Sequence, residues 1–191
     1  MVEAREKFFP QLLAGTPLCD VVVLDESYAT TTFTRLRGRC AQGRRLTQPV
    51  PAGHWKRLTI LAAITVAGVL TASSIEASTD GEVFRGFVDE CLVPNLRAGM
   101  VVVMDNLSSH KVAGIREAIE AVGARVVYLP PYSPDLSPIE PSWSKVKQVL
   151  RTIGARDVPS LHEAVGQALS ALTAADCLGY FTGCSYTLHL K

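Results

Sequence analysis

Apolar residues along the chain gather in short continuous runs, which is the pattern of strands buried on both faces of a sheet. One run covers residues 21–24, a second covers 100–104, and a third covers 126–129 within an expected strand over 125–129. A longer stretch, residues 58–75, contains no charge and is interrupted by Ala67-Gly68. Its length reaches the lower limit for a membrane span, but its Thr, Ser and β-branched content favours two buried strands joined by a tight turn. We therefore expect no membrane segment.

Other parts of the chain have the apolar period of helices. Asp80 can cap a helix that ends near Pro94, and Ser108 or Ser109 can begin another that Gly123 stops. Further helices are expected up to residue 13, over 138–151 and over 159–173. Strands that alternate with helices predict an α/β fold, a mixed sheet flanked by helices. At 191 residues, the chain is expected to form a single domain over residues 1–191.

Composition places the chain among globular proteins, with 48% hydrophobic and 19% charged residues. Its five cysteines are odd in number and scattered without a C-x-x-C pair. We interpret them as free thiols in a reducing compartment, and since nothing resembles a secretory signal we expect a cytoplasmic protein.

The net charge is only +1, but the charges are unevenly distributed. Between Ser27 and Ile75 there is no acidic residue. The same stretch contains seven basic residues, Arg35, Arg37, Arg39, Arg44, Arg45, Lys56 and Arg57. A one-sided block of this kind suits a polyanion such as DNA, and it equally suits a solvated strand surface. Both interpretations stay open from the charges alone.

Two acids, Asp25 and Asp105, each close an apolar run. The carboxyl ends of neighbouring strands are where sites gather in α/β sheets, so these carboxylates are expected to converge. An uncompensated pair would repel, which indicates a cation between them, and oxygen ligands favour Mg²⁺ or Mn²⁺. Asn106 is expected to orient its neighbour Asp105. The alternative is that each Asp only caps the turn that follows it.

A third acid, Glu140, lies at the start of an expected helix. Ser137-Pro138-Ile139-Glu140 is a complete capping-box pattern, so a purely structural role competes with a catalytic one. The two roles are compatible, because a helix N-terminus holds a carboxylate in a fixed place. Lys147 and Arg151 share the helix face of Glu140, where they can follow a phosphate backbone.

Taken together, these motifs resemble a known family. The run Val102 to Lys111, followed by Tyr128 to Glu140 with its long Y-L-P-P-Y-S-P element and then by Trp143, resembles the DDE superfamily endonuclease domain of bacterial insertion-sequence transposases related to the mariner group. The spacing of 34 residues between Asp105 and Glu140 is similar to that family's spacing, Asp25 matches its first acid, and residues 53–57 resemble a further stretch.

The resemblance implies a ribonuclease-H-like fold and an enzyme that cuts and joins DNA at transposon ends. Asp25, Asp105 and Glu140 would be the catalytic residues and the ligands of two Mg²⁺ (or Mn²⁺) ions. Asn106 and His110 would support those ligands. The expected partners are double-stranded DNA, as transposon ends and target, and a second copy in a homodimer on DNA. The residues expected to contact DNA are Arg44, Arg45, Lys56, Arg57, Lys147 and Arg151.

The chain also departs from the family. Such transposases normally have an N-terminal helix-turn-helix region that reads the transposon ends, and no room for it exists before Asp25. We therefore expect a separate catalytic domain without that region, and a separate DNA-binding subunit as a further partner. Ser137 stands where the family commonly has Asn, with little expected effect.

Three alternatives remain open at this point. The chain is either the transposase domain, a ribonuclease-H-like nuclease without strand transfer, or an inactive remnant that serves as a DNA-binding or dimerisation module. For Trp55 we expect a ring that packs against the sheet rather than one that stacks on a flipped base.

Overall fold

The computed structural model describes residues 5, 7–9 and 15–189. Within this part of the chain, five strands form one sheet in the order β3-β2-β1-β4-β5. Strand β1 is antiparallel to β2 and parallel to β4, and β4 is parallel to β5. The predicted mixed sheet is therefore confirmed, including the two strands joined by a turn at residues 66–67. The bounds are Val21–Thr30 for β1, Arg57–Thr65 for β2, Gly68–Ile75 for β3, Val101–Met104 for β4 and Arg125–Tyr128 for β5.

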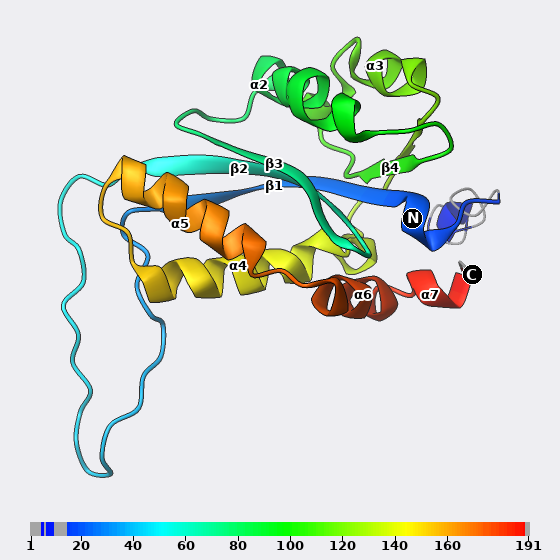
Figure 1. The fold of residues 1–191 in the computed structure, drawn as a ribbon. Helices are drawn as coiled ribbons and strands as arrows, with labels where there is room; N and C mark the ends of the chain where they lie inside the picture. Colours follow the sequence, from blue (N-terminus) through cyan, green and yellow to red (C-terminus); the bar gives the residue numbers. More distant parts are fainter. Residues whose placement is uncertain (1–4, 6, 10–14, 190–191) are drawn as a thin grey trace.

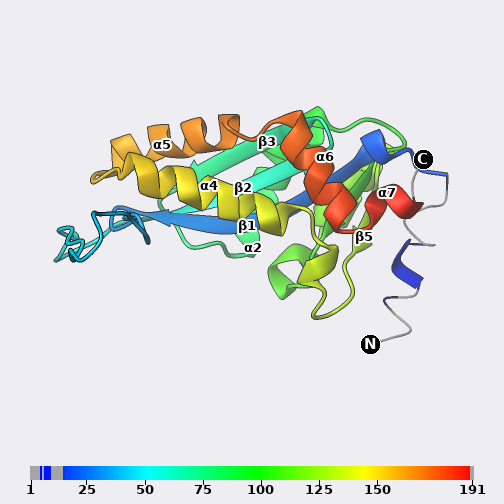
Figure 2. The same ribbon diagram turned by 90° about the horizontal axis from the view of Figure 1, so that it is seen from below.

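Helices cover both faces of the sheet, as Figure 1 shows. One face is covered by α4 (Ile139–Ile153), α5 (Val158–Ser170), α6 (Ala174–Gly183) and α7 (Tyr186–His189), and the other by α2 (Gly81–Phe87) and α3 (Ile115–Ala121). Figure 2 shows α4 and α5 lying side by side along β1 and β2. Short turns of 3-10 or π-helix complete the described structure: Leu18–Asp20 (η1), Val88–Leu92 (η2), Val93–Asn95 (η3), Ser108–Lys111 (η4) and Pro134–Leu136 (η5).

The apolar run of β1 is buried on both faces. Val21 and Val23 belong to the core beneath α4, whereas Val22 and Leu24 belong to the core beneath α2 and α3. Successive strand residues point to opposite faces, so a continuous apolar run is what a two-sided core requires. The same alternation decides which way the polar residues that follow Leu24 will point.

Two expected helices differ from the structure on the α2 side of the sheet. Asp80 caps α2 as predicted, accepting a hydrogen bond from the backbone N–H of Val83, but α2 passes into η2 and η3 instead of continuing as one helix. The helix predicted from Ser108 begins only at Ile115. The 3-10 segment ends at Lys111, and Gly114, the N-cap of α3, has a left-handed backbone with φ 91° that redirects the chain into the helix.

The C-terminal half agrees better with the sequence pattern. Helices α4 and α5 lie within a few residues of the predicted 138–151 and 159–173, whereas α6 and α7 were not predicted. Residues 7–9 are helical as expected, and the rest of the helix predicted up to residue 13 lies outside the described residues. No described helix has both the length and the apolar character that crossing a membrane would require.

Residues 31–56, which we call the arm, connect β1 to β2 and project away from the sheet (Figure 1). The arm contains no helix or strand, and its residues 35–50 are all exposed. The side chain of Trp55 is 56% exposed, so the expectation that it packs against the sheet is wrong. The basic block of the sequence is therefore displayed largely on a solvated projection.

Candidate active site

The first predicted acid, Asp25, lies within β1 rather than at its end, so that prediction is corrected. Strand β1 continues to Thr30 because it stays paired with β2, in which Ala62 is the partner of Asp25. The parallel pairing with β4 stops one residue earlier, at Leu24 and Met104. Asp25 therefore stands where β4 has ended, and the sheet is open on one side of it.

The second acid, Asp105, directly follows β4, as predicted. Its Oδ1 accepts a hydrogen bond from the backbone N–H of Leu107 (3.0 Å), so the turn-capping role considered for it is real. The same oxygen lies 2.5 Å from Nδ1 of His110, which is an ion-pair contact rather than a well-aligned hydrogen bond. Both contacts use one oxygen of the carboxylate.

The third acid, Glu140, is the second residue of α4, and the predicted capping box is absent. The N-cap is Pro138, and no side chain caps the helix. Ser137 is buried, and it contacts Glu140 through its backbone carbonyl, which accepts the Glu140 N–H at 3.2 Å. The carboxylate of Glu140 is exposed and therefore available for another role.

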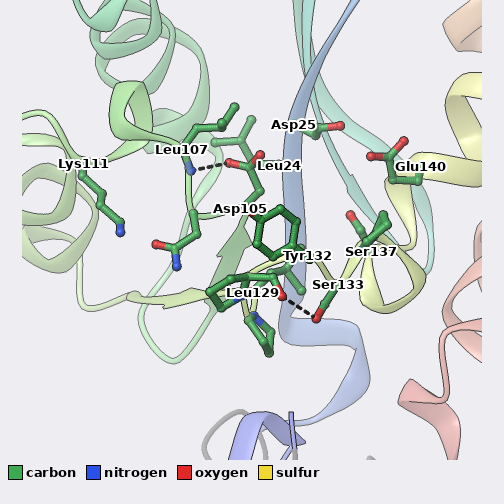
Figure 3. Close-up of a pocket in the computed structure, with 14 residues that line it drawn as sticks. Leu24, Asp25, Asp105, Leu107, Lys111, Leu129, Tyr132, Ser133, Ser137 and Glu140 are labelled. Carbon is green, nitrogen blue, oxygen red and sulfur yellow. Dashed lines mark hydrogen bonds between the residues drawn. The ribbon is translucent and has the colours of Figure 1, made fainter. Parts of the chain in front are cut away.

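All three acids line one pocket of about 500 Å³. Figure 3 shows the side chains of Asp25 and Glu140 turned toward one another, with Asp105 facing the same pocket from the end of β4. Asn106 and Lys111 also line the pocket, as does the proline-rich loop at residues 129–134. Residues far apart in the sequence thus meet because the end of β4 and the start of α4 both lie beside Asp25 in the middle of β1.

Tyr132, within that proline-rich loop, has an unusual backbone. Its φ is 55°, in the left-handed region that non-glycine residues rarely adopt, and its side chain is 89% exposed at the pocket. The loop is held by Arg5, which donates hydrogen bonds to Ser133 (2.9 Å) and to Asp135 (2.5 Å). Backbone strain held in place by surrounding contacts is common at functional sites.

Asp25 is held in an environment that opposes its charge. Burial first, and then the nearby carboxylates of Glu140 and Glu26, raise its pKa, whereas hydrogen bonds from Trp143 and from the backbone of Glu26 lower it; the net result is a pKa of about 7. That bond runs from Nε1 of Trp143 to Oδ2 of Asp25 and measures 2.9 Å. The tryptophan therefore fixes the orientation of the carboxyl group on the α4 side of the sheet.

The residue after Asp25 points the other way. Glu26 Oε2 lies 2.7 Å from Nε2 of His110, whose ring is fully buried and stacked on Phe84 with centroids 4.1 Å apart. Burial disfavours the charged ring, but the carboxylates of Asp105 and Glu26 outweigh it and raise the pKa of His110 to about 9. Burial likewise raises the pKa of Asp105, but the contact with His110 and the hydrogen bond from Leu107 outweigh it, so the net shift is downward.

The pocket suits a divalent cation by its donors, although it is not closed around one. Among the described residues, no three His, Cys, Asp or Glu side chains are close enough to form a ready-made metal site. The carboxylate of Glu140 nevertheless adds to burial in raising the pKa of Asp25, so the two acids repel each other. A cation between them would remove that repulsion, and three carboxylates are the hard oxygen donors that Mg²⁺ and Mn²⁺ prefer.

The basic residues expected at DNA fall into different settings. Lys56 is paired with Glu76 at 3.0 Å, whereas Arg44 and Arg45 are exposed on the arm. Three others rest on aromatic rings: Arg57 and Lys147 lie over Tyr28, at 4.7 Å and 4.8 Å from its centroid, and Arg151 lies over Phe33 at 5.0 Å.

Sequence reasoning missed the roles of Glu26 and Trp143. The signal was present for Glu26, because in a strand buried on both faces the residue after Asp25 must point into the opposite layer. For Trp143, the helical period placed the ring in the core but could not show that its N–H reaches Asp25.

Comparison with known proteins places this geometry in a family. A family model described as DDE superfamily endonuclease matches residues 20–162, and the chain belongs to that family. A comparison with curated protein sequences finds no significant match.

Solved structures of Mos1 transposase share the fold. A pre-cleavage Mos1 transpososome superposes with a TM-score of 0.76 at 16% identity, over 97% of this chain and 61% of that one. The Mos1 strand transfer complex gives a TM-score of 0.74 at 16% identity, over 97% of this chain and 57% of that one. The catalytic domain of Mos1 mariner transposase gives a TM-score of 0.64 at 13% identity, over 99% of this chain and 92% of that one. This chain thus spans about three-fifths of the transpososome protein, and the ribonuclease-H-like fold expected from the resemblance is confirmed.

Proposed function

We propose that this chain is the catalytic domain of a DNA transposase that cuts and joins DNA strands, with Asp25, Asp105 and Glu140 as the catalytic residues and metal ligands. The observation that supports this most directly is the meeting of these three acids around one pocket. Membership of the DDE endonuclease family points to the same chemistry. The metals would be two Mg²⁺ or Mn²⁺ ions, and Mos1 structures have been solved with Mn and with Mg.

The residues of the chain have distinct tasks in this proposal. When bound, the divalent ions would activate a water or a DNA 3′-hydroxyl and neutralise charge on the attacked phosphodiester. Trp143 holds the carboxyl group of Asp25 toward Glu140, and His110 holds Asp105 from the opposite layer of the fold. Lys111 lines the same pocket, where its ammonium group can contact a phosphate.

Double-stranded DNA is the proposed substrate. Arg57, Lys147 and Arg151 would contact its backbone without reading sequence, together with Arg44 and Arg45 on the arm. Lys56 is expected to contribute less because Glu76 neutralises it. Assembly as a homodimer on DNA and a separate subunit that reads transposon ends belong to the proposal as well; Mos1 has been solved as a paired-end complex with a transposon end.

Nicking of supercoiled plasmid in the presence of Mg²⁺ or Mn²⁺ tests the catalytic part. The wild-type protein is expected to nick the plasmid, and Asp105→Asn to abolish nicking while the circular dichroism spectrum stays unchanged. Absence of metal-dependent nicking by the wild type would instead support the inactive remnant.

Strand transfer is tested with pre-cut duplexes taken from the DNA that flanks the gene, mixed with plasmid. Joined products support the transposase. Nicking without joining supports the ribonuclease-H-like nuclease, which shares the metal chemistry but not the transfer step.

A further inference from the structure

A second groove, separate from the pocket of the three acids, lies between the base of the arm and α4. Its volume is about 520 Å³. The arm contributes Arg35, Leu36 and Arg37, and α4 contributes Ser144, Gln148 and Arg151. Three guanidinium groups from two separate segments therefore line one groove.

These three arginines differ from others on the surface. Among the residues that the structure describes, none of the three forms an ion pair with a carboxylate, whereas Arg97 is paired with Asp20 and Arg116 with Glu120. Like charges held together repel unless an anion lies between them. The hydroxyl of Ser144 and the amide of Gln148 add uncharged hydrogen-bond donors of the kind that phosphate oxygens accept.

The groove is held in shape by contacts at its base. Nη1 of Arg156 donates hydrogen bonds to the backbone carbonyls of Thr31 (3.0 Å) and Phe33 (2.9 Å), which fixes the arm where it leaves β1. The ring of Phe33 in turn supports the guanidinium of Arg151 at 5.0 Å. A planar guanidinium supported on a ring keeps its donors directed and loses little freedom on binding.

Helix α4 connects this groove to the active site. Glu140, Ser144, Lys147 and Arg151 repeat every three or four residues and so share one face of the helix. From Glu140 to Arg151 this face extends roughly 16 Å, at about 1.5 Å per residue. One DNA strand places a phosphate about every 3.4 Å along the duplex axis, so the separation corresponds to about five nucleotides.

We propose that the groove of Arg35, Arg37 and Arg151 is a phosphodiester-binding subsite, which holds the DNA backbone about five nucleotides from the bond being cut. The inference rests on the proposed function, because it assumes that DNA is the substrate, and it names where the substrate is held beyond the acids. The subsite acts by position and charge and takes no part in the chemical step.

Protection of arginines from phenylglyoxal, read by mass spectrometry, tests the subsite directly. The full chain is modified with and without a mixed-sequence duplex of about 20 base pairs, long enough to reach from the acids to the groove. The duplex is expected to protect Arg35, Arg37 and Arg151. Arg97 and Arg116, which are exposed and paired, serve as internal controls on the same molecules and should stay reactive.

Binding of the same duplex, followed by fluorescence anisotropy as a function of salt, gives a second readout. The variant R37Q/R151Q is expected to lower the magnitude of the slope of log K against log salt by about 1–2, as the loss of one or two phosphate contacts requires. The variant R97Q/R116Q removes the same formal charge and should leave the slope unchanged. Equal effects of the two variants would show a general charge effect and overturn the subsite.

Plasmid nicking by the same preparations separates this inference from the proposed function. Metal-dependent nicking without protection of the three arginines would overturn the subsite and leave the catalytic proposal intact. Protection without nicking would support the groove as a DNA site and contradict the catalytic role of the acids. Absence of both arginine protection and nicking would overturn the subsite and the catalytic proposal together.

Discussion

Replacing Asp25 by Asn is expected to stabilise the metal-free protein, although it removes a proposed catalytic residue. Folding removes the carboxyl group from water and places it beside Glu140, which disfavours the charged form. Burial is the largest of the causes that raise its pKa to about 7 from the ordinary 3.8. Asparagine has the shape of the neutral form, and its amide oxygen can still accept the hydrogen bond from Trp143. The variant therefore keeps the contact and loses the unfavourable charge.

The sign of the effect follows from the direction of the pKa shift. A group whose pKa is raised on folding stabilises the folded state by keeping its proton, and this stabilisation is complete below pH 3.8 and lost as pH rises toward about 7. The advantage of asparagine is thus absent near pH 4 and complete above pH 7. The pKa difference sets an upper limit of ~4 kcal/mol, and solvent relaxation around a partly accessible group reduces the expected gain to ~1–2 kcal/mol.

Thermal unfolding followed by circular dichroism, in EDTA, measures the effect. For a chain of this size the expected gain corresponds to a Tm higher by about 3–6 °C near pH 8, and by clearly less near pH 5. Other groups, including His110, titrate in both proteins, so their contributions cancel when the Tm of the wild type is subtracted from that of the variant. Added Mg²⁺ should raise the Tm of the wild type but not of Asp25→Asn, since only the wild type keeps the ligand. A difference in Tm that is the same at both pH values would refute the desolvation argument.

Three further predictions concern neighbours of the pocket. Trp143→Phe removes the donor to Asp25 and is expected to weaken Mg²⁺ affinity, measured by calorimetry, by about 10–100-fold; unchanged affinity would contradict a positioning role. Glu140→Gln should abolish metal-dependent nicking without lowering the Tm, because Glu140 makes no capping bond; retained nicking would show that it is not a ligand. Tyr132→Gly relieves the backbone at φ 55° and should stabilise the protein by ~0.5–1 kcal/mol in urea unfolding, whereas Tyr132→Phe should not.

The sheet and the meeting of the acids could be predicted because both follow from short-range patterns. Continuous apolar runs indicate strands buried on both faces, and the two runs that end in Asp25 and Asp105 lie on strands that the fold places side by side. The position of Asp25 within β1 could not be predicted in this way. What extends β1 to Thr30 is pairing with β2, in which the partner of Thr30 is Arg57, 27 residues further along the chain, and the local sequence pattern does not show this pairing.

The errors at helix starts have the same origin. Ser137 satisfies a capping pattern, yet it is buried next to η5, and α4 begins at Ile139 with Pro138 as its N-cap and no capping side chain. The segment after Ser108 has helical composition, but His110 is drawn into the core between Glu26 and Asp105, and Gly114 then turns the chain before α3 begins. In both places tertiary contacts outweigh local propensity.

The site is built across two layers of the fold. Asp25 is oriented from the α4 layer by Trp143, whereas Asp105 is oriented from the α2 layer by His110, and Glu26 anchors that histidine from the strand residue next to Asp25. Because adjacent residues of one strand face opposite layers, β1 connects the supports of both acids. A change in either core that shifts β1 against β4 must therefore alter the distance between the two carboxylates, even when it touches neither of them. Core substitutions beneath α2, such as Phe84→Leu, which removes the ring stacked on His110, are accordingly expected to reduce nicking more than their effect on Tm explains.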